Sequence, residues 1–436
     1  MDFALFILLN AVLFIRPEEL YPEIAGLRLY LIVISVTLLA ALPKIVRQLS
    51  PEELERRPIT VCVLGLLAAA ALSQLARGQF DVVQEFVPEF AKVIAYYLVL
   101  VAVVDSPRRF RIFLGFQVIF ICAVATLGVL QYFGYVDFEA LKPFVQRSID
   151  PESGNLVESL RLRASGIFND PNDLCLVLVF GSLCCLYQAA AAANKLVKAL
   201  WVLPIGLFGF TLILTGSRGG LLGLLAGLSA LIYAKFGWKR ALPLILVGAP
   251  AMVLAIGGRQ AEFDATDSGH ARLMLWADGL GALFSSPTFI LTGIGVSGYA
   301  EETGHVAHNS FVHAYVEMGL IGGTLFLGAF VTAVWTLFYW KRLDQSRIPR
   351  DLQTAWPFVL AIIAGYSGGV FSLSRDYSVP TYMCLGIATA YVALTVPKAP
   401  IRLRVSQPWA KNMAVAGVAG LVFLKFFTQF ALAIGM

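Results

Sequence analysis

Long apolar segments alternate with short polar ones along most of this chain. A helix needs about 20 apolar residues to cross the core of a bilayer, with a tolerated range of about 17–25. By this rule the pattern predicts thirteen membrane-spanning segments, of which the first and the fourth are short. They cover residues 3–15, 27–45, 59–76, 93–104, 112–133, 174–193, 197–214, 221–236, 242–256, 309–340, 356–373, 379–396 and 413–434. The first segment could instead be re-entrant or interfacial, which would leave twelve full crossings.

The composition agrees with a membrane protein. Hydrophobic residues make up 58% of the 436 residues and charged residues only 14%, against roughly 25% charged residues in a soluble domain. We therefore expect one integral membrane domain, residues 1–436, with an all-α fold: a polytopic bundle of 12–13 transmembrane helices and one large extracytoplasmic loop. The net charge of +5 is spread over the loops and indicates no nucleic-acid partner. The six cysteines lie in or beside apolar segments without metal-ligand spacing, which favours packing over disulfides or zinc.

Basic residues assign the two sides of the membrane, because Lys and Arg are enriched in cytoplasmic loops. The loops at 44–58, 105–111, 194–198, 235–240, 341–350 and 397–411 hold 20 of the 33 Lys and Arg residues, and the alternating loops hold 12. The first set is expected in the cytoplasm, as in a multi-pass protein of the inner membrane. The outer loop 134–173 and the large loop 257–307 are then expected to face the periplasm or the exterior.

Three polar segments on the outer side carry arginines, although Lys and Arg are generally less frequent on that side of a membrane. Their candidate binding residues are Arg161, Arg163, Asn172, Ser217, Arg218, Gly219, Gly220, Arg272 and Asn309. Each segment leads into a span that begins on the outer side, and the N-terminus of a helix attracts anions. The arginine fork suits phosphate oxygens. These features predict an outward-facing pocket for a phosphate-bearing substrate, although asparagine and serine at such positions could equally be helix caps.

All four histidines fall within 44 residues, from His270 to His313. Imidazole changes its charge nearest neutral pH, so proton transfer is expected in this part of the chain. His305 and His313 are interpreted as a surface residue and a helix-interior residue. Apolar residues at helical spacing predict an amphipathic interfacial helix over 272–284, within the large loop.

Two further patterns have simpler interpretations. Gly293-x-Gly295-x-x-Gly298 matches a dinucleotide-binding fingerprint, but the required βαβ context is not predicted here. His305-x-x-His308 has possible metal-ligand spacing, but a catalytic zinc would need a third ligand and a supporting shell. We expect neither a metal nor a cofactor.

Several of these motifs together resemble the O-antigen ligase and polymerase superfamily. They are Thr215-Gly-Ser-Arg218-Gly-Gly, Arg272-x-x-x-Trp276, and His308-Asn309 followed by Glu317-x-Gly319-Leu-Ile-Gly322, with Arg163-x-x-Gly166-x-Phe168-x-x-Pro171-Asn172 upstream. The similarity in order and spacing covers roughly residues 160–325, and the core that carries the motifs is residues 174–325.

The resemblance implies a glycosyltransferase of the extracytoplasmic face. Such an enzyme moves a glycan from an undecaprenyl-diphosphate carrier to a glycan or lipid-anchored acceptor, such as lipid A core. It also implies functional roles for Arg218 and Arg272 and, as the base, for His308. We expect an inverting, metal-independent displacement. Asp376 is a possible orienting acid, unless it simply pairs with Arg375.

Two alternatives stay open. A repeat-unit polymerase of the same superfamily would use the same donor-binding residues. A transporter or flippase for lipid-linked sugars would need charged residues inside the spans. The predicted spans are nearly free of them, with Glu317 and Lys425 as the exceptions.

Overall fold

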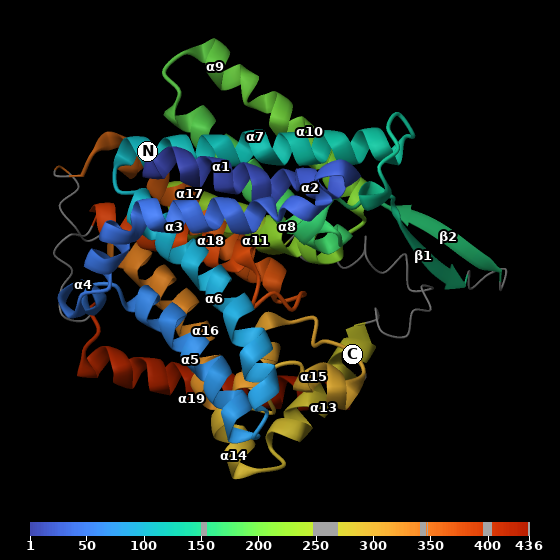
Figure 1. The fold of residues 1–436 in the computed structure, drawn as a ribbon, viewed down its shortest axis with the longest axis vertical. Coiled ribbons are helices and arrows are strands. Elements are labelled where there is room, and N and C mark those ends of the chain that lie inside the picture. Colours follow the sequence, from blue (N-terminus) through green and yellow to red (C-terminus); the bar gives the residue numbers. More distant parts are fainter. Residues whose placement is uncertain (150–154, 247–268, 341–345, 347, 396–402, 435–436) are drawn as a thin grey trace. The chain divides into compact units, whose positions relative to one another are not determined.

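The structure, a computed structural model, describes residues 1–149, 155–246, 269–340, 346, 348–395 and 403–434. Almost all of these residues are helical (Figure 1). The chain divides into two compact units, each assembled from three separate stretches. The first unit contains Met1–Ile45, Val99–Glu262 and Leu343–Gly369, and the second contains Val46–Leu98, Phe263–Arg342 and Val370–Met436.

The first unit contains elements from three stretches of the chain. Its elements are α1 (Asp2–Ile15), α2 (Pro17–Leu20), η1 (Pro22–Leu27), most of α3 (Leu29–Gln48), α7 (Pro107–Tyr132), η2 (Glu139–Leu141), β1 (Phe144–Ile149), β2 (Leu156–Arg161), η3 (Gly166–Phe168), α8 (Pro171–Ala191), α9 (Lys195–Leu200), α10 (Val202–Thr215), α11 (Arg218–Phe236) and α17 (Arg350–Val370).

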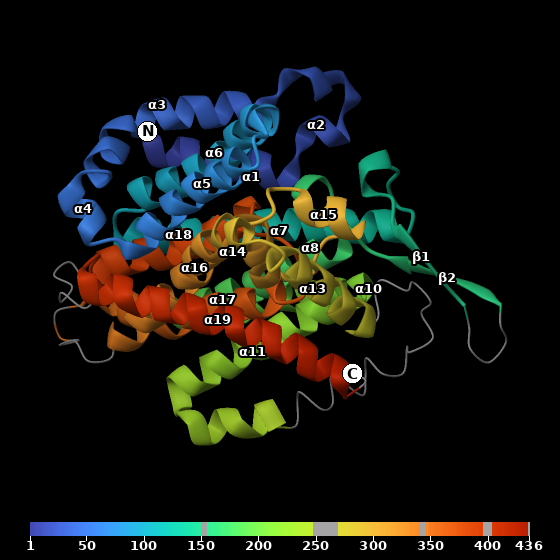
Figure 2. The same ribbon diagram turned by 90° about the horizontal axis from the view of Figure 1, so that it is seen from below.

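The second unit contains the remaining helices. They are α4 (Pro51–Glu55), α5 (Pro58–Ala76), most of α6 (Phe80–Val103), α13 (Gly269–Leu283), α14 (Pro287–Thr292), α15 (Gly298–Thr303), α16 (Ser310–Trp340), α18 (Val379–Thr395) and α19 (Gln407–Ala433). Figure 2 shows α13 alongside α19, with which it is in contact.

The predicted all-α membrane bundle is confirmed. In the part of the chain that the structure describes, nine helices are long and apolar enough to cross a membrane: α3, α5, α6, α7, α8, α9 with α10, α11, α16 and α19. Three other predicted spans correspond to α1, α17 and α18. The predicted span 242–256 lies largely outside the described residues.

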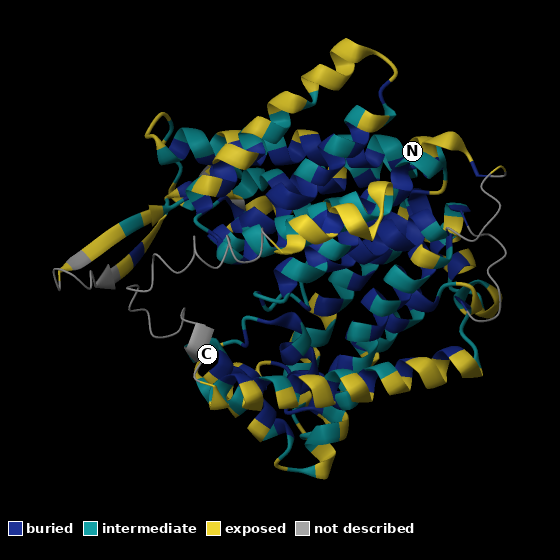
Figure 3. Ribbon diagram, turned by 180° about the vertical axis from the view of Figure 1, so that it is seen from behind, coloured by how far each residue is buried: buried dark blue, intermediate teal, exposed yellow. Residues whose placement is uncertain are grey.

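The outward surface of α19 shows why such helices need lipid. Its buried residues recur every three or four positions, as at Met413, Gly417 and Leu421. Further along the helix Phe423 and Phe426 are exposed, and Figure 3 shows exposed and buried positions alternating along the whole helix. A row of exposed aromatic side chains would be unfavourable in water, whereas it matches the acyl chains of a bilayer.

Two elements differ from the hydropathy prediction. The fourth span is not short, because α6 begins at Phe80 and continues for 24 residues through a stretch that contains Asp81, Glu85 and Glu89. The segment 134–173, which the sequence predicts as a loop on the outer side, contains a two-stranded antiparallel sheet, in which Phe144 pairs with Arg161. In Figure 1 this hairpin extends beyond the ends of α7 and α10 in the same unit.

Glycines allow α11 and α17 to pack at very short range within the first unit. A Cβ atom added at Gly223 would lie 2.9 Å from the carbonyl oxygen of Gly365, and one at Gly227 would lie 3.2 Å from that of Ala361. Small residues of this kind let membrane helices approach with their backbones in contact. The seam starts five residues after Arg218, the first residue of α11.

Candidate functional site

Arg161 joins the polar segments of the first unit. It is the last residue of β2, and its Nε donates to the carbonyl oxygen of Thr215 at 2.8 Å. One guanidinium nitrogen donates to Asn172 Oδ1 at 3.1 Å and the other to Gln146 Oε1 at 3.2 Å. The segments 161–173 and 215–220, which sequence analysis singled out separately, therefore meet at this arginine.

The Thr215–Gly220 turn is shaped by capping and close packing. Ser217 caps α11 by accepting the N–H of Gly220 at 3.2 Å, and Arg218 is partly exposed at the first helical position. Gly219 and Gly220 are buried, and a Cβ at Gly220 would overlap the sulfur of Cys175 in α8. The absence of a side chain at Gly220 is therefore required for helix packing.

The two other predicted residues of this unit have defined surroundings. Arg163 Nε donates to the carbonyl oxygen of Lys142 at 2.7 Å. Asp170, and not Asn172, caps α8, because Asp170 Oδ1 accepts the N–H of Asn172 at 2.7 Å. Asn172 therefore has its carboxamide oxygen available for Arg161.

In the second unit, Trp276 brings the helix that carries Arg272 to His308. Trp276 lies one turn after Arg272 in α13, and its indole N–H donates to the carbonyl oxygen of Ala307 at 2.7 Å. This bond explains the spacing of the Arg-x-x-x-Trp motif, since the tryptophan holds the residue directly before His308. A helix is present at Gly269–Leu283, and its apolar residues Leu273 and Trp276 pack in a cluster with Leu421 of α19. Its predicted position at the membrane interface stays a prediction.

His308 and Asn309 form the entry to α16. The backbone of His308 has φ of 50°, in the left-handed region that non-glycine residues rarely adopt. Asn309 is fully buried, and its Oδ1 caps the helix by accepting the N–H groups of Phe311 at 2.9 Å and Val312 at 3.2 Å. Strained backbone of this kind persists where the surrounding structure fixes it, and it is concentrated at functional sites.

Helix α16 is interrupted at Gly319, where φ is 66° and ψ is −166°. The carbonyl of Val316 accepts the N–H of Ile294 at 2.9 Å, and that of Glu317 accepts the N–H of Gly295 at 3.1 Å and the Ser73 hydroxyl at 2.5 Å. A Cβ at Gly293 would overlap the Glu317 carbonyl. Gly293 and Gly295 of the Gly293–Gly298 pattern thus pack against the interruption.

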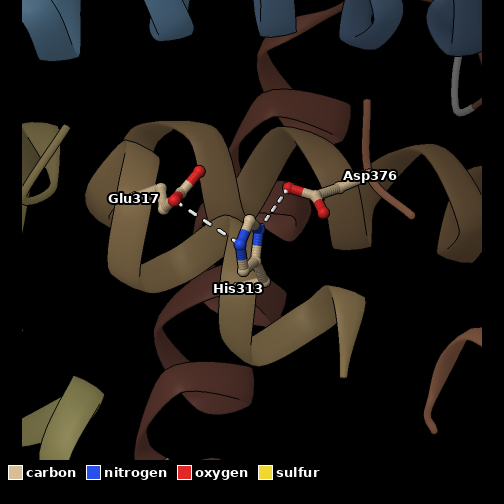
Figure 4. A group of neighbouring side chains, drawn as sticks. All are labelled: His313, Glu317 and Asp376. Atoms are coloured by element: carbon tan, nitrogen blue, oxygen red, sulfur yellow. Dashed lines mark hydrogen bonds and ion pairs between the residues drawn. The ribbon is translucent and has the colours of Figure 1, made fainter. Parts of the chain in front are cut away.

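A buried group of ionisable side chains lies between the start of α16 and this interruption (Figure 4). His313 Nδ1 lies 3.0 Å from Asp376 Oδ2, and His313 Nε2 lies 3.4 Å from Glu317 Oε1. All three residues are at most 6% exposed. In Figure 4 the two carboxylates approach opposite edges of the imidazole ring, so the arrangement suits a ring that donates from both nitrogens.

Two tyrosines complete this group. Tyr377 donates its hydroxyl to Glu317 Oε2 at 3.0 Å. Burial, followed by the charges of Glu317 and Asp376, raises the pKa of Tyr377 well above its ordinary value, so that it remains a donor. Tyr299 stacks on the His313 ring with centroids 5.6 Å apart and donates to the carbonyl oxygen of Leu275 in α13. The group therefore links α13, α15, α16 and the turn before α18.

The same three side chains, His313, Glu317 and Asp376, are the set of potential metal ligands found among the described residues, with ligand atoms within 4.8 Å of one another. One ion could bind only one nitrogen of the ring, however, and each nitrogen faces a different carboxylate. The geometry fits a hydrogen-bonded ionic group better than a three-ligand site. Neither His305 nor His308 belongs to it.

Sequence analysis did not identify this group as a unit. His313 was interpreted as a helix-interior residue and Asp376 as an acid that either orients the base or pairs with Arg375; the structure instead places Asp376 at His313. The available signal was Glu317, a carboxylate inside a predicted span, since ionisable residues at such positions are usually functional and paired.

A cavity of about 210 Å³ in the second unit is lined by residues such as Arg57, Thr336 and Thr389, and by none of the predicted site residues.

The segment that carries most of the motifs is similar to a known protein family. Residues 203–327 match the family described as O-antigen ligase. The matched segment contains Arg218, Arg272 and His308, which confirms the resemblance based on these motifs. Arg161, Arg163 and Asn172 precede it. Comparison with curated proteins gives no match.

Proposed function

We propose that this chain, which matches the O-antigen ligase family over residues 203–327, transfers a glycan from an undecaprenyl-diphosphate carrier to a hydroxyl group of a glycan or lipid-anchored acceptor. The reaction takes place on the extracytoplasmic face of the inner membrane, to which the positive-inside distribution of Lys and Arg assigns the motif-bearing loops. The carrier and the acceptor are the partners, together with the bilayer that holds both.

The observation that carries the proposal is the bond from Trp276 to the carbonyl of Ala307 at 2.7 Å. It ties the α13 helix, with Arg272 one turn away, to the residue before His308. This contact supports a site in which the cationic fork of Arg272 and the imidazole of His308 act together at the start of α16, whose N-terminus adds partial positive charge. This combination suits a reaction in which a proton is removed while negative charge grows on a phosphate.

In the proposed reaction His308 accepts the proton of the acceptor hydroxyl while its oxygen attacks the anomeric carbon. The bond from that carbon to the diphosphate oxygen breaks, and its electron pair stays on the diphosphate. A single displacement inverts the anomeric configuration. The diphosphate is a stable anion, so Arg272 and Arg218 act by stabilising its charge, and a metal ion is not required.

The first-unit residues are proposed to support donor binding. Arg218 has this role on the basis of its motif, and Ser217, Gly219 and Gly220 shape the turn that presents it. Arg161 donates to Asn172 at 3.1 Å. We therefore propose that these two residues stabilise the Thr215–Gly220 turn and also contact the substrate. Arg163 is proposed to add a further positive charge to donor binding.

The test is transfer by purified protein in nanodiscs, with an undecaprenyl-diphosphate glycan as the donor. His308→Ala should lower the rate by about 10²–10⁴, the usual contribution of a general base. His305→Ala is the matched control, because His305 is an exposed histidine of the same segment. Wild-type turnover by a folded His308→Ala variant would exclude His308 as the base.

A repeat-unit polymerase is the alternative within the family, and product analysis separates the two. A ladder of products on the lipid carrier indicates a polymerase, whereas a single transfer to a lipid A core acceptor indicates a ligase. The donor-binding residues are the same in both reactions.

A transporter of lipid-linked sugars is a second candidate, favoured by the ionisable group at His313 and Glu317 inside a predicted span. Vesicles reconstituted with the protein and a fluorescent lipid-linked glycan distinguish the two functions. Translocation of the lipid without a covalent product would support the transporter, and product formation without translocation would support the enzyme.

A further inference from the structure

The carboxamide of Asn309 has an unused donor in a buried position. Its Oδ1 is occupied by two N–H groups of α16, whereas its Nδ2 has no hydrogen-bond partner among the residues that the structure describes, although Asn309 is fully buried. A buried donor without an acceptor costs about 1–3 kcal/mol. Such a group in a folded protein needs an explanation, and a bound ligand that supplies the acceptor is one.

A second buried polar atom without a partner lies on the turn before α18. This turn is joined to the start of α16 by Ser310, whose Oγ donates to the carbonyl oxygen of Leu373 at 2.6 Å and accepts the N–H of Arg375 at 2.8 Å. Ser374, between these two residues, has a buried Oγ that meets no hydrogen-bond partner within the described part of the chain. Two unused polar groups are therefore found on segments that Ser310 holds together.

The charges of this turn are oriented by its other contacts. The carboxylate of Asp376 is bound at His313 Nδ1 at 3.0 Å, and Tyr382 donates to the Asp376 carbonyl at 2.8 Å. Arg375 Nη1 donates to the carbonyl oxygen of Ser374 at 2.7 Å, which holds the guanidinium at the backbone of Ser374. The acidic residue of the turn is thus held inward, and the basic residue is held beside Ser374.

We propose that Asn309, Ser374 and Arg375 form a phosphate-binding subsite at the N-terminus of α16. Asn309 Nδ2 and the Ser374 hydroxyl donate to phosphate oxygens, Arg375 supplies the compensating charge, and the start of the helix adds its partial positive charge. The ligand is a phosphate of the lipid diphosphate donor, so this inference rests on the proposed function for the identity of its ligand. It adds a contribution from the turn before α18 to donor binding.

Binding of undecaprenyl diphosphate and of inorganic pyrophosphate to the full chain in nanodiscs tests the subsite. Asn309→Asp is the sharpest variant, because aspartate caps a helix as well as asparagine does but replaces the donor with a repelling carboxylate. We expect its Kd for undecaprenyl diphosphate to rise at least about tenfold, with smaller increases for Ser374→Ala and Arg375→Gln. Asn194→Asp is the matched control, since Asn194 caps α9 by accepting the N–H of Leu196 at 2.8 Å.

The outcomes separate the two proposals. Unchanged affinity in Asn309→Asp and Arg375→Gln, with wild-type protein binding the lipid, overturns the subsite and leaves the transferase proposal standing. Weakened affinity in these variants without any transfer by the wild-type protein supports the subsite and contradicts the transferase. If the variants weaken the binding of pyrophosphate and of undecaprenyl diphosphate equally, the subsite recognises the phosphates alone. If the wild-type protein binds neither probe, the subsite proposal is overturned.

Discussion

Replacement of Gly319 by alanine tests whether the interruption of α16 is built into the backbone. The residue has φ of 66° and ψ of −166°, a region that is almost restricted to glycine, and a side chain there costs about 1–3 kcal/mol. The added Cβ would overlap the backbone carbonyl of Leu291 and would lie 2.5 Å from the nitrogen of Gly293. Overpacking of this kind typically costs a further ~1–3 kcal/mol. We therefore expect Gly319→Ala to lower the free energy of unfolding by about 2–6 kcal/mol.

Gly281→Ala provides the matched control for this variant. Gly281 lies inside α13 in the same unit, and a Cβ there would meet no atom within 4 Å. Alanine should raise stability at this position by about 0.5–1 kcal/mol, because it favours the helix over the unfolded chain. Unfolding of both variants in detergent, followed by circular dichroism, measures the difference. If Gly319→Ala unfolds like Gly281→Ala, the interruption is not held by backbone contacts and our interpretation of this region is wrong.

Three further predictions concern the contacts around the site. Trp276→Phe leaves the buried carbonyl of Ala307 without its donor and should cost about 1–3 kcal/mol of stability; an unfolding midpoint equal to that of the wild type would contradict the role of this bond. Asp376→Ala removes one partner of a buried ionic group and should cost about 3–5 kcal/mol, whereas Asp376→Asn, which can still hydrogen-bond to His313, should cost less. Equal losses in the two variants would argue against the His313 contact. Ser217→Ala removes the cap of α11 and should cost about 0.5–2 kcal/mol, while Ser217→Asn should retain most of the stability; the same assay reports both.

The sequence predicted the membrane helices well because lipid imposes one strong rule, a long apolar segment for each crossing. The same rule misplaced the start of α6. Asp81, Glu85 and Glu89 made residues 77–92 look like a loop, but a helix can continue past the apolar core when its acidic turns lie outside it. The β1–β2 hairpin was missed because residues 144–161 mix charged and apolar residues without a regular alternation.

The arginines and His308 were found from local motifs, since each motif is a short, continuous segment. The partners of these residues could not be found in that way. His313 and Asp376 are 63 residues apart in the chain, and no local spacing connects them. The bond from Trp276 to Ala307 likewise joins residues 31 positions apart, and only the fold brings them together.

The glycine seam between α11 and α17 has a mechanical consequence for Arg218. Where two main chains touch without intervening side chains, neither helix can slide or rotate without a steric collision. The position of Arg218 at the start of α11 is thus set by backbone registration and not by adjustable side chains. A single methyl group at Gly223 would act as a wedge, and it would shift the arginine without altering any residue of the Thr215–Gly220 turn.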